Sequence, residues 1–164
     1  MKAIISAAII TFAVAPAVAE TLPEQILAVH NAEREALAIA PLSWSDTLAA
    51  DAQRWADHLA AAGKFEHAGS DENPESGENL AAGSAGSFTP AQLAQLWAGE
   101  KSKFRPGTFP DVSTSGNWAD VGHYTQMIWR NTTTVGCGMA SGSGSDYLVC
   151  RYNPSGNYTG QPPY

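Results

Sequence analysis

Several features are scarce in this sequence of 164 residues, and each scarcity argues against a class of protein. Only Cys137 and Cys150 are cysteines, and neither belongs to a CxxC pair, so we do not expect a cysteine-ligated zinc site. Lysine and arginine number 9 against 16 acidic residues, which gives a formal net charge of −7. Because an acidic chain repels nucleic acids and anionic membrane surfaces, we expect neither as a partner.

Long apolar segments are also scarce. One runs from residue 3 to 15, which is too short for a membrane span of about 20 apolar residues. It follows Lys2 and precedes Ala17-Val18-Ala19, a small-x-small cleavage pattern. We therefore predict a signal peptide over residues 1–19 and one exported domain, secreted or periplasmic, over residues 20–164. The alternative is an uncleaved anchor. Removal leaves 145 residues (164 − 19), enough for one core, with a net charge of −8 because Lys2 is lost.

Hydrophobic periodicity predicts four helices, over residues 22–39, 46–62, 90–104 and 121–129. Thr89 and Pro90 fit the N-cap and first position of the third helix, and Asp120 fits the N-cap of the fourth. Between these two helices lies a long segment, residues 105–120, and segments of this length are usually functional or mobile.

The C-terminal part of the chain predicts a β-hairpin. Residues 134–140 and 146–152 flank the turn sequence SGSGSD. A turn centred between Ser143 and Gly144 places Cys137 opposite Cys150, with apolar pairs on the same face. Both faces of the hairpin are apolar, which indicates helices on both sides. The predicted class is therefore α+β, a three-layer α-β-α sandwich with a central antiparallel sheet. In an exported chain the opposed cysteines predict a disulfide, although two buried free thiols are the alternative.

Four polar residues stand where they could carry chemistry. Glu100 falls on the apolar face of the third helix with Leu93, Leu96, Trp97 and Phe104, where a carboxylate needs a partner or must reach water from the edge. His123, His67 and Glu78 are each weak candidates alone, because a lone histidine is more often a satisfied core residue. His30 and His58 have ordinary solvent-facing explanations on their helices, so we exclude them.

The combination of motifs resembles the CAP superfamily, which includes cysteine-rich secretory proteins, antigen 5 venom proteins and group one plant pathogenesis-related proteins. The resemblance spans about residues 24–158 and rests on HNAER (30–34), LSWSDTLAADAQRWA (42–56), SGENLA (76–81), GHYTQMIWRNTTTVGCG (122–138) and YLVCRYNPSGNY (147–158). This chain departs from the family in having a single cysteine pair and no cysteine-rich extension. The channel-modulating activity of extended members is therefore not carried over.

The resemblance implies an α-β-α sandwich and a cavity lined by two histidines and two glutamates. By motif these are His67, Glu78 and His123; Glu100 follows from its helix position. We predict a weak divalent-metal site, zinc by preference, with His67 and His123 as ligands. Glu78 and Glu100 would accept the second N–H of each imidazole. Affinity should be lost in acid as the imidazoles protonate.

The resemblance also implies a ligand, because family members bind sterols, fatty acids or other small hydrophobic molecules. Phe104, Phe109 and Trp118 stand where sterol-binding members carry an aromatic-rich loop. These aromatics either contact a ligand or pack into the core. We expect Tyr124, Ile128 and Trp129 to be core residues. We also expect Gly136 and Gly138 to let a helix approach the sheet.

Two other functions remain open. One is recognition of another organism or of a cell wall, as an effector or defence protein. The other is a metal-dependent hydrolase, for which some family members have been proposed. The sequence lacks HExxH and GxSxG, and two imidazoles fall short of the three protein ligands that catalytic zinc normally has.

Overall fold

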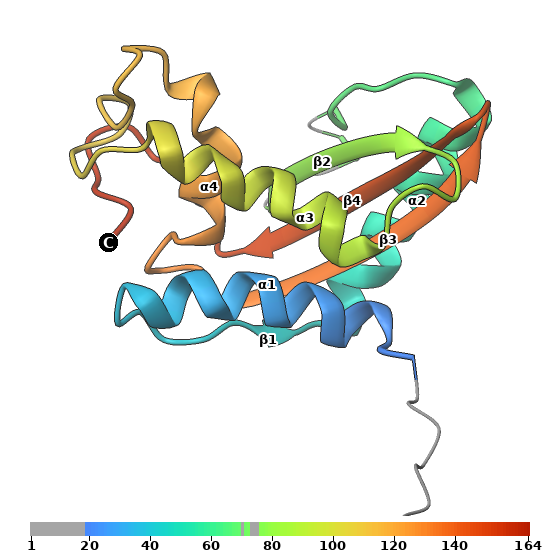
Figure 1. Cartoon of the computed structure of the whole chain (residues 1–164), viewed down its shortest axis with the longest axis horizontal. Helices are drawn as coiled ribbons and strands as arrows, with labels where there is room; N and C mark the ends of the chain where they lie inside the picture. Colours follow the sequence, from blue (N-terminus) through green and yellow to red (C-terminus); the bar gives the residue numbers. More distant parts are fainter. Residues whose placement is uncertain (1–18, 70, 73–75) are drawn as a thin grey trace, which may run out of the picture.

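The computed structural model describes residues 19–69, 71–72 and 76–164, so nearly all of the predicted signal peptide lies outside the described residues. A four-stranded sheet separates α2 (Asp46–Ala62) from a layer of α1 (Leu22–Ala36), α3 (Pro90–Gly99) and α4 (Gly122–Met127) (Figure 1). Two 3-10 helices, η1 (Glu100–Lys103) and η2 (Trp118–Asp120), lie between α3 and α4. The α-β-α sandwich is confirmed.

The strands run in the order β1-β3-β4-β2, so β2 lies at one edge of the sheet. The predicted hairpin is β3 (Thr134–Gly142) and β4 (Ser145–Asn153), and Cys137 lies opposite Cys150 as expected. These two residues form a disulfide. β2 (Gly77–Ser84) pairs antiparallel with β4, whereas the two-residue β1 (Ser43–Trp44) pairs parallel with β3.

Two hydrophobic cores fill the space between the layers. One lies between the sheet and the layer of α1, α3 and α4, and it includes Tyr124, Ile128 and the disulfide. The second lies between the sheet and α2. Trp129 belongs to a smaller cluster with Phe109, and it is 1% exposed. The prediction that Tyr124, Ile128 and Trp129 are core residues is therefore confirmed.

The glycines of β3 allow α2 to lie directly on the sheet. A Cβ atom at Gly136 would stand 2.4 Å from the Ser45 carbonyl oxygen, and one at Gly138 would stand 2.3 Å from the Cα of Gln53. Any side chain at these positions would therefore push helix and sheet apart, and the expected close approach is confirmed.

α2 has its predicted bounds, whereas the other three helices end earlier than their periodicity predicted. α1 stops at Ala36, and α3 stops at Gly99 before the tighter turn of η1. Asp120 does not cap α4, because it belongs to η2 and its carboxylate instead accepts from the Ser115 hydroxyl at 2.7 Å. Leu96, which the periodicity placed on the apolar face of α3, is 54% exposed. Among the described residues, no helix is both long and apolar enough to cross a membrane.

Candidate functional site

Two His–Glu pairs face one cavity at the beginning of β2. His67 follows α2 and its Nδ1 lies 2.6 Å from Oε1 of Glu78, the second residue of β2. His123 is the second residue of α4, and its Nδ1 lies 2.6 Å from Oε1 of Glu100, the first residue of η1. The fold therefore brings together, as two pairs, the four residues that the sequence singled out.

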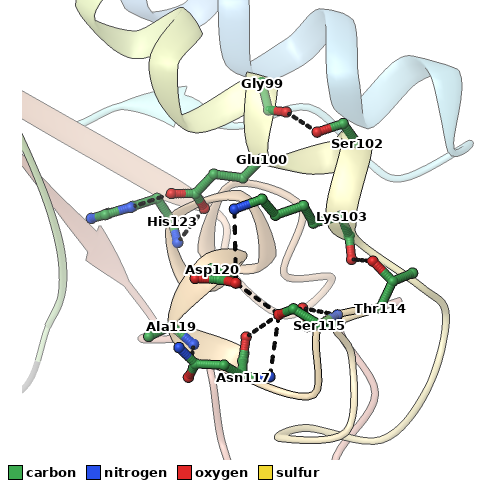
Figure 2. Close-up of polar contacts among 11 residues, drawn as sticks. Gly99, Glu100, Ser102, Lys103, Thr114, Ser115, Asn117, Ala119, Asp120 and His123 are labelled. Atoms are coloured by element: carbon green, nitrogen blue, oxygen red, sulfur yellow. Dashed lines mark hydrogen bonds and ion pairs between the residues drawn. The ribbon is translucent and has the colours of Figure 1, made fainter.

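Glu100 points inward, as its helical phase predicted, and its side chain is 19% exposed. Besides the His123 imidazole (Figure 2), its carboxylate accepts two backbone N–H groups through Oε2, those of His123 and Tyr124, each at 3.0 Å. A buried carboxylate is stable only with such partners. The three hydrogen bonds provide them, and they fix the start of α4 against the end of α3.

Glu78 is more deeply buried, with a side chain 5% exposed, although its partner His67 is 62% exposed. Its Oε1 also accepts the backbone N–H of Ala68 at 3.1 Å. Its Oε2 lies 3.1 Å from a guanidinium nitrogen of Arg151 on β4. Arg151 is thus a site residue that the sequence did not suggest.

The carboxylates determine the tautomer of each imidazole. An ionised carboxylate can only accept hydrogen bonds, so we assign a proton to Nδ1 of His67 and of His123. Each Nε2 then carries a lone pair and engages no hydrogen bond among the contacts of the described residues. An imidazole that is oriented by a carboxylate through one nitrogen is the usual arrangement of a metal-binding histidine. Among the described residues, no cluster of three or more metal-ligating side chains occurs.

The cavity has a volume of about 520 Å³ and combines polar with aromatic walls. Its lining residues are His67, Ala68, Glu78, Asn79, Phe109, Trp118, Ala119, Gly122, His123 and Asn157. Phe109 is 6% exposed and packs into the core, whereas Trp118 is 46% exposed and meets Phe109 edge to face. Phe104 lies elsewhere, against Tyr124 and Tyr164. Of the three aromatic residues expected at a ligand, Phe109 and Trp118 therefore share one cavity with the histidines, and Phe104 does not.

The segment 105–120 is held in place at both ends. Lys103 lies 3.7 Å from Asp120, whose carboxylate also accepts from Ser115 (Figure 2). The backbone of Phe109 exchanges two hydrogen bonds of 2.9 Å with Gly160 and Gln161 of the C-terminal tail. Trp118 therefore lies at the cavity on a segment that these contacts hold against the rest of the domain.

A chain of buried, hydrogen-bonded polar groups contacts the backbone of His123. Asn79, 1% exposed, donates to the His123 carbonyl oxygen and to the Tyr152 hydroxyl, each at 3.1 Å. That hydroxyl lies 2.8 Å from Nε2 of His30, whose Nδ1 donates to the Ile26 carbonyl oxygen. The expectation that His30 faces solvent is wrong, because the residue is completely buried. Burial lowers its pKa to about 4 and raises that of Tyr152 well above its ordinary value.

The chain is similar in sequence to known proteins. The family model described as "CAP: Cysteine-rich secretory protein family" matches residues 27–152. A pathogenesis-related protein of the PR-1 type from Sambucus nigra is 35% identical over 148 residues, which cover 90% of this chain and 84% of the relative. Pathogenesis-related protein 1A from Nicotiana tabacum is 37% identical over 147 residues, covering 89% and 83%.

Among solved structures, a crystal structure of NaASP2 with Zn2+ superposes with a TM-score of 0.76. The match covers 89% of this chain and 86% of that chain at 24% identity, so it concerns the fold alone. The family match, the similar relatives and the observed fold all agree with the resemblance inferred from the sequence motifs. This chain belongs to the CAP family of cysteine-rich secretory proteins.

Proposed function

We propose that this protein is an exported binding protein whose cavity holds a divalent metal ion, zinc by preference, and a small hydrophobic ligand. The observation that carries the metal site is the pairing of each cavity histidine with a glutamate through Nδ1 at 2.6 Å. Because each Nδ1 is already hydrogen-bonded, both Nε2 atoms are available to the metal, and both rings are oriented. When bound, the ion supplies a Lewis-acidic centre with open coordination positions.

The aromatic wall of the same cavity supports the second part of the proposal. Trp118 keeps 46% of its surface exposed at the cavity although it contacts the buried Phe109. An apolar ligand that covered this ring would remove apolar surface from water. A sterol or a fatty acid has the apolar surface to do so. Since the imidazoles are few and polar, we expect the aromatic side chains to provide more of the ligand affinity than the histidines.

Isothermal titration calorimetry with zinc tests the metal site. The wild type should bind about one zinc ion weakly, since it supplies two protein ligands, and the double variant His67→Ala/His123→Ala should not bind. His58→Ala is the matched control, because His58 is exposed and stacks on Trp55 in α2. Equal binding by the wild type and the double variant would contradict the proposal.

A lipid-binding assay on delipidated protein tests the ligand. We expect a sterol or fatty acid probe to bind with a Kd of about 1 µM or tighter, and Trp118→Ala to weaken it about tenfold or more. His123→Ala should change the affinity little. Phe88→Ala is the control, because Phe88 is also an exposed aromatic but lies against Gly83 near the other end of β2. Loss of binding in His123→Ala but not in Trp118→Ala would place the ligand on the histidines instead.

The recognition function remains the alternative to ligand binding. It is favoured by the relatives, which are named pathogenesis-related proteins. A screen in which delipidated protein binds neither sterols nor fatty acids would support recognition. Turnover of a peptide library that is abolished by a chelator would instead support the hydrolase that the sequence left open.

A further inference from the structure

The two histidines are supported from opposite faces of one strand. Successive residues of a strand point to opposite faces of the sheet. Glu78 of β2 accordingly reaches His67 on the side of α2, whereas its neighbour Asn79 reaches the His123 carbonyl on the side of α4. Because β2 is an edge strand, both faces end at the same cavity. Each half of the site therefore has its own buried support.

Arg151 is the support of the Glu78 half. It lies directly opposite Glu78 in the register of β2 and β4, and its side chain is 2% exposed. Its guanidinium nitrogen stands 3.1 Å from Glu78 Oε2, an atom with no aligned hydrogen bond to any described residue. Burial lowers the pKa of Arg151, and the charge of Glu78 is the main influence that opposes this shift. A buried guanidinium beside a carboxylate oxygen fixes the position of that carboxylate.

In the other half of the site, the carboxylate of Glu100 is positioned by backbone N–H groups instead of by a cation. Glu100 accepts two backbone N–H groups through Oε2, whereas Glu78 has the Arg151 guanidinium at its Oε2. In each pair this leaves Oε1 for the imidazole. The comparison indicates that Arg151 does for Glu78 what the start of α4 does for Glu100.

We propose that Arg151 is a positioning residue for the ligand His67: its guanidinium holds the Glu78 carboxylate in place, so that Oε1 accepts the hydrogen bond of His67 Nδ1 and Nε2 faces the cavity. The effect of Arg151 on zinc affinity rests on the proposed metal site. The effect of Arg151 on the His67 imidazole does not rest on that site, since the tautomer exists with or without metal. Removal of groups that orient a metal-binding histidine typically lowers metal affinity by about 10- to 100-fold.

The test combines histidine 15N NMR of the metal-free protein at about pH 8, where imidazoles in water are neutral, with zinc calorimetry. In Arg151→Gln, His67 should shift from the Nδ1–H tautomer to the mixture typical of an exposed imidazole, and zinc affinity should fall about 10- to 100-fold. Arg151→Lys keeps the buried charge and should retain the Nδ1–H tautomer. It also keeps the test decisive if the glutamine variant does not fold.

Arg34→Gln is the matched control. Arg34 is equally buried, but its guanidinium donates to the backbone carbonyls of Ala40, Met127, Trp129 and Thr132. This variant should lose stability and leave the His67 tautomer unchanged. An unaltered tautomer in Arg151→Gln, a changed one in Arg151→Lys, or an equal change in Arg34→Gln would each overturn the inference. A wild type that binds no zinc would refute the metal site alone, because the NMR measurement still tests Arg151.

Discussion

His30 should make the stability of this protein depend on pH in the acid range. The imidazole is completely buried, and both ring nitrogens are in hydrogen bonds, Nδ1 to the Ile26 carbonyl and Nε2 to the Tyr152 hydroxyl. A second proton on Nε2 would face the Tyr152 hydrogen and would place a charge in the core, near the cation of Arg34. Burial, with a smaller contribution from Arg34, lowers the pKa from 6.5 to about 4.

The sign and size of the effect follow from proton linkage. Between pH 6.5 and about 4, the unfolded chain binds a proton at this position and the folded chain does not, so stability falls as the pH falls. The full contribution is the difference between the two pKa values, 6.5 and about 4, multiplied by about 1.36 kcal/mol, or roughly 3–4 kcal/mol. Because His30 is half protonated in the folded state at pH 4, about 3 kcal/mol should be lost between pH 7 and pH 4.

Urea denaturation at pH 7 and pH 4 measures this loss. His30→Gln keeps a hydrogen-bonding side chain but cannot titrate, so its loss between the two pH values should be smaller than that of the wild type by about 3 kcal/mol. Acidic groups elsewhere titrate equally in both proteins and cancel. The exposed His58→Gln should behave like the wild type. Equal losses in wild type and His30→Gln would refute the reasoning.

The remaining predictions concern the scaffold. Gly138→Ala should destabilise the fold by about 1–3 kcal/mol, because its Cβ would lie 2.3 Å from Gln53 Cα. Gly99→Ala is the control, because its Cβ would meet nothing within 4 Å and should not destabilise the fold. Equal chemical-denaturation midpoints for the two variants would contradict this prediction. Reduction of Cys137–Cys150, which are separated by 13 positions, should cost about 3 kcal/mol in the chain-entropy model. Thiol titration of the unfolded, unreduced protein should find no free thiol, and two thiols would contradict the bond.

The sequence was most informative where local patterns determine the structure. The β-hairpin has opposed apolar residues on both strands and a glycine-rich turn, so its register and the Cys137–Cys150 pairing could be predicted directly. Glu100 was identifiable because a carboxylate on an apolar helical face is costly without a partner. The remaining members of the two His–Glu pairs came from the family motifs rather than from any physical pattern.

The supports of the site were missed for two physical reasons. β2 consists largely of small residues, which have weak strand propensity, so no strand was predicted there and no partner for Arg151 could be inferred. On α1, the buried stripe at Ile26, His30 and Arg34 is polar at two of three positions. A search for apolar periodicity treats such residues as solvent-facing. Their burial becomes evident only when distant hydrogen-bonding partners, such as the Tyr152 hydroxyl, are in place.

The central claim is that Nε2 of His67 and Nε2 of His123 together bind a metal ion in the cavity that Trp118 borders. Anomalous diffraction at the zinc edge, from crystals soaked in zinc, locates the ion directly. The account predicts one peak in the cavity, about 2.1 Å from each Nε2, with Glu78 and Glu100 still bonded to the two Nδ1 atoms. A peak bound to the carboxylates or to Nδ1, or no peak in the cavity under conditions that saturate the binding measured in solution, would contradict it.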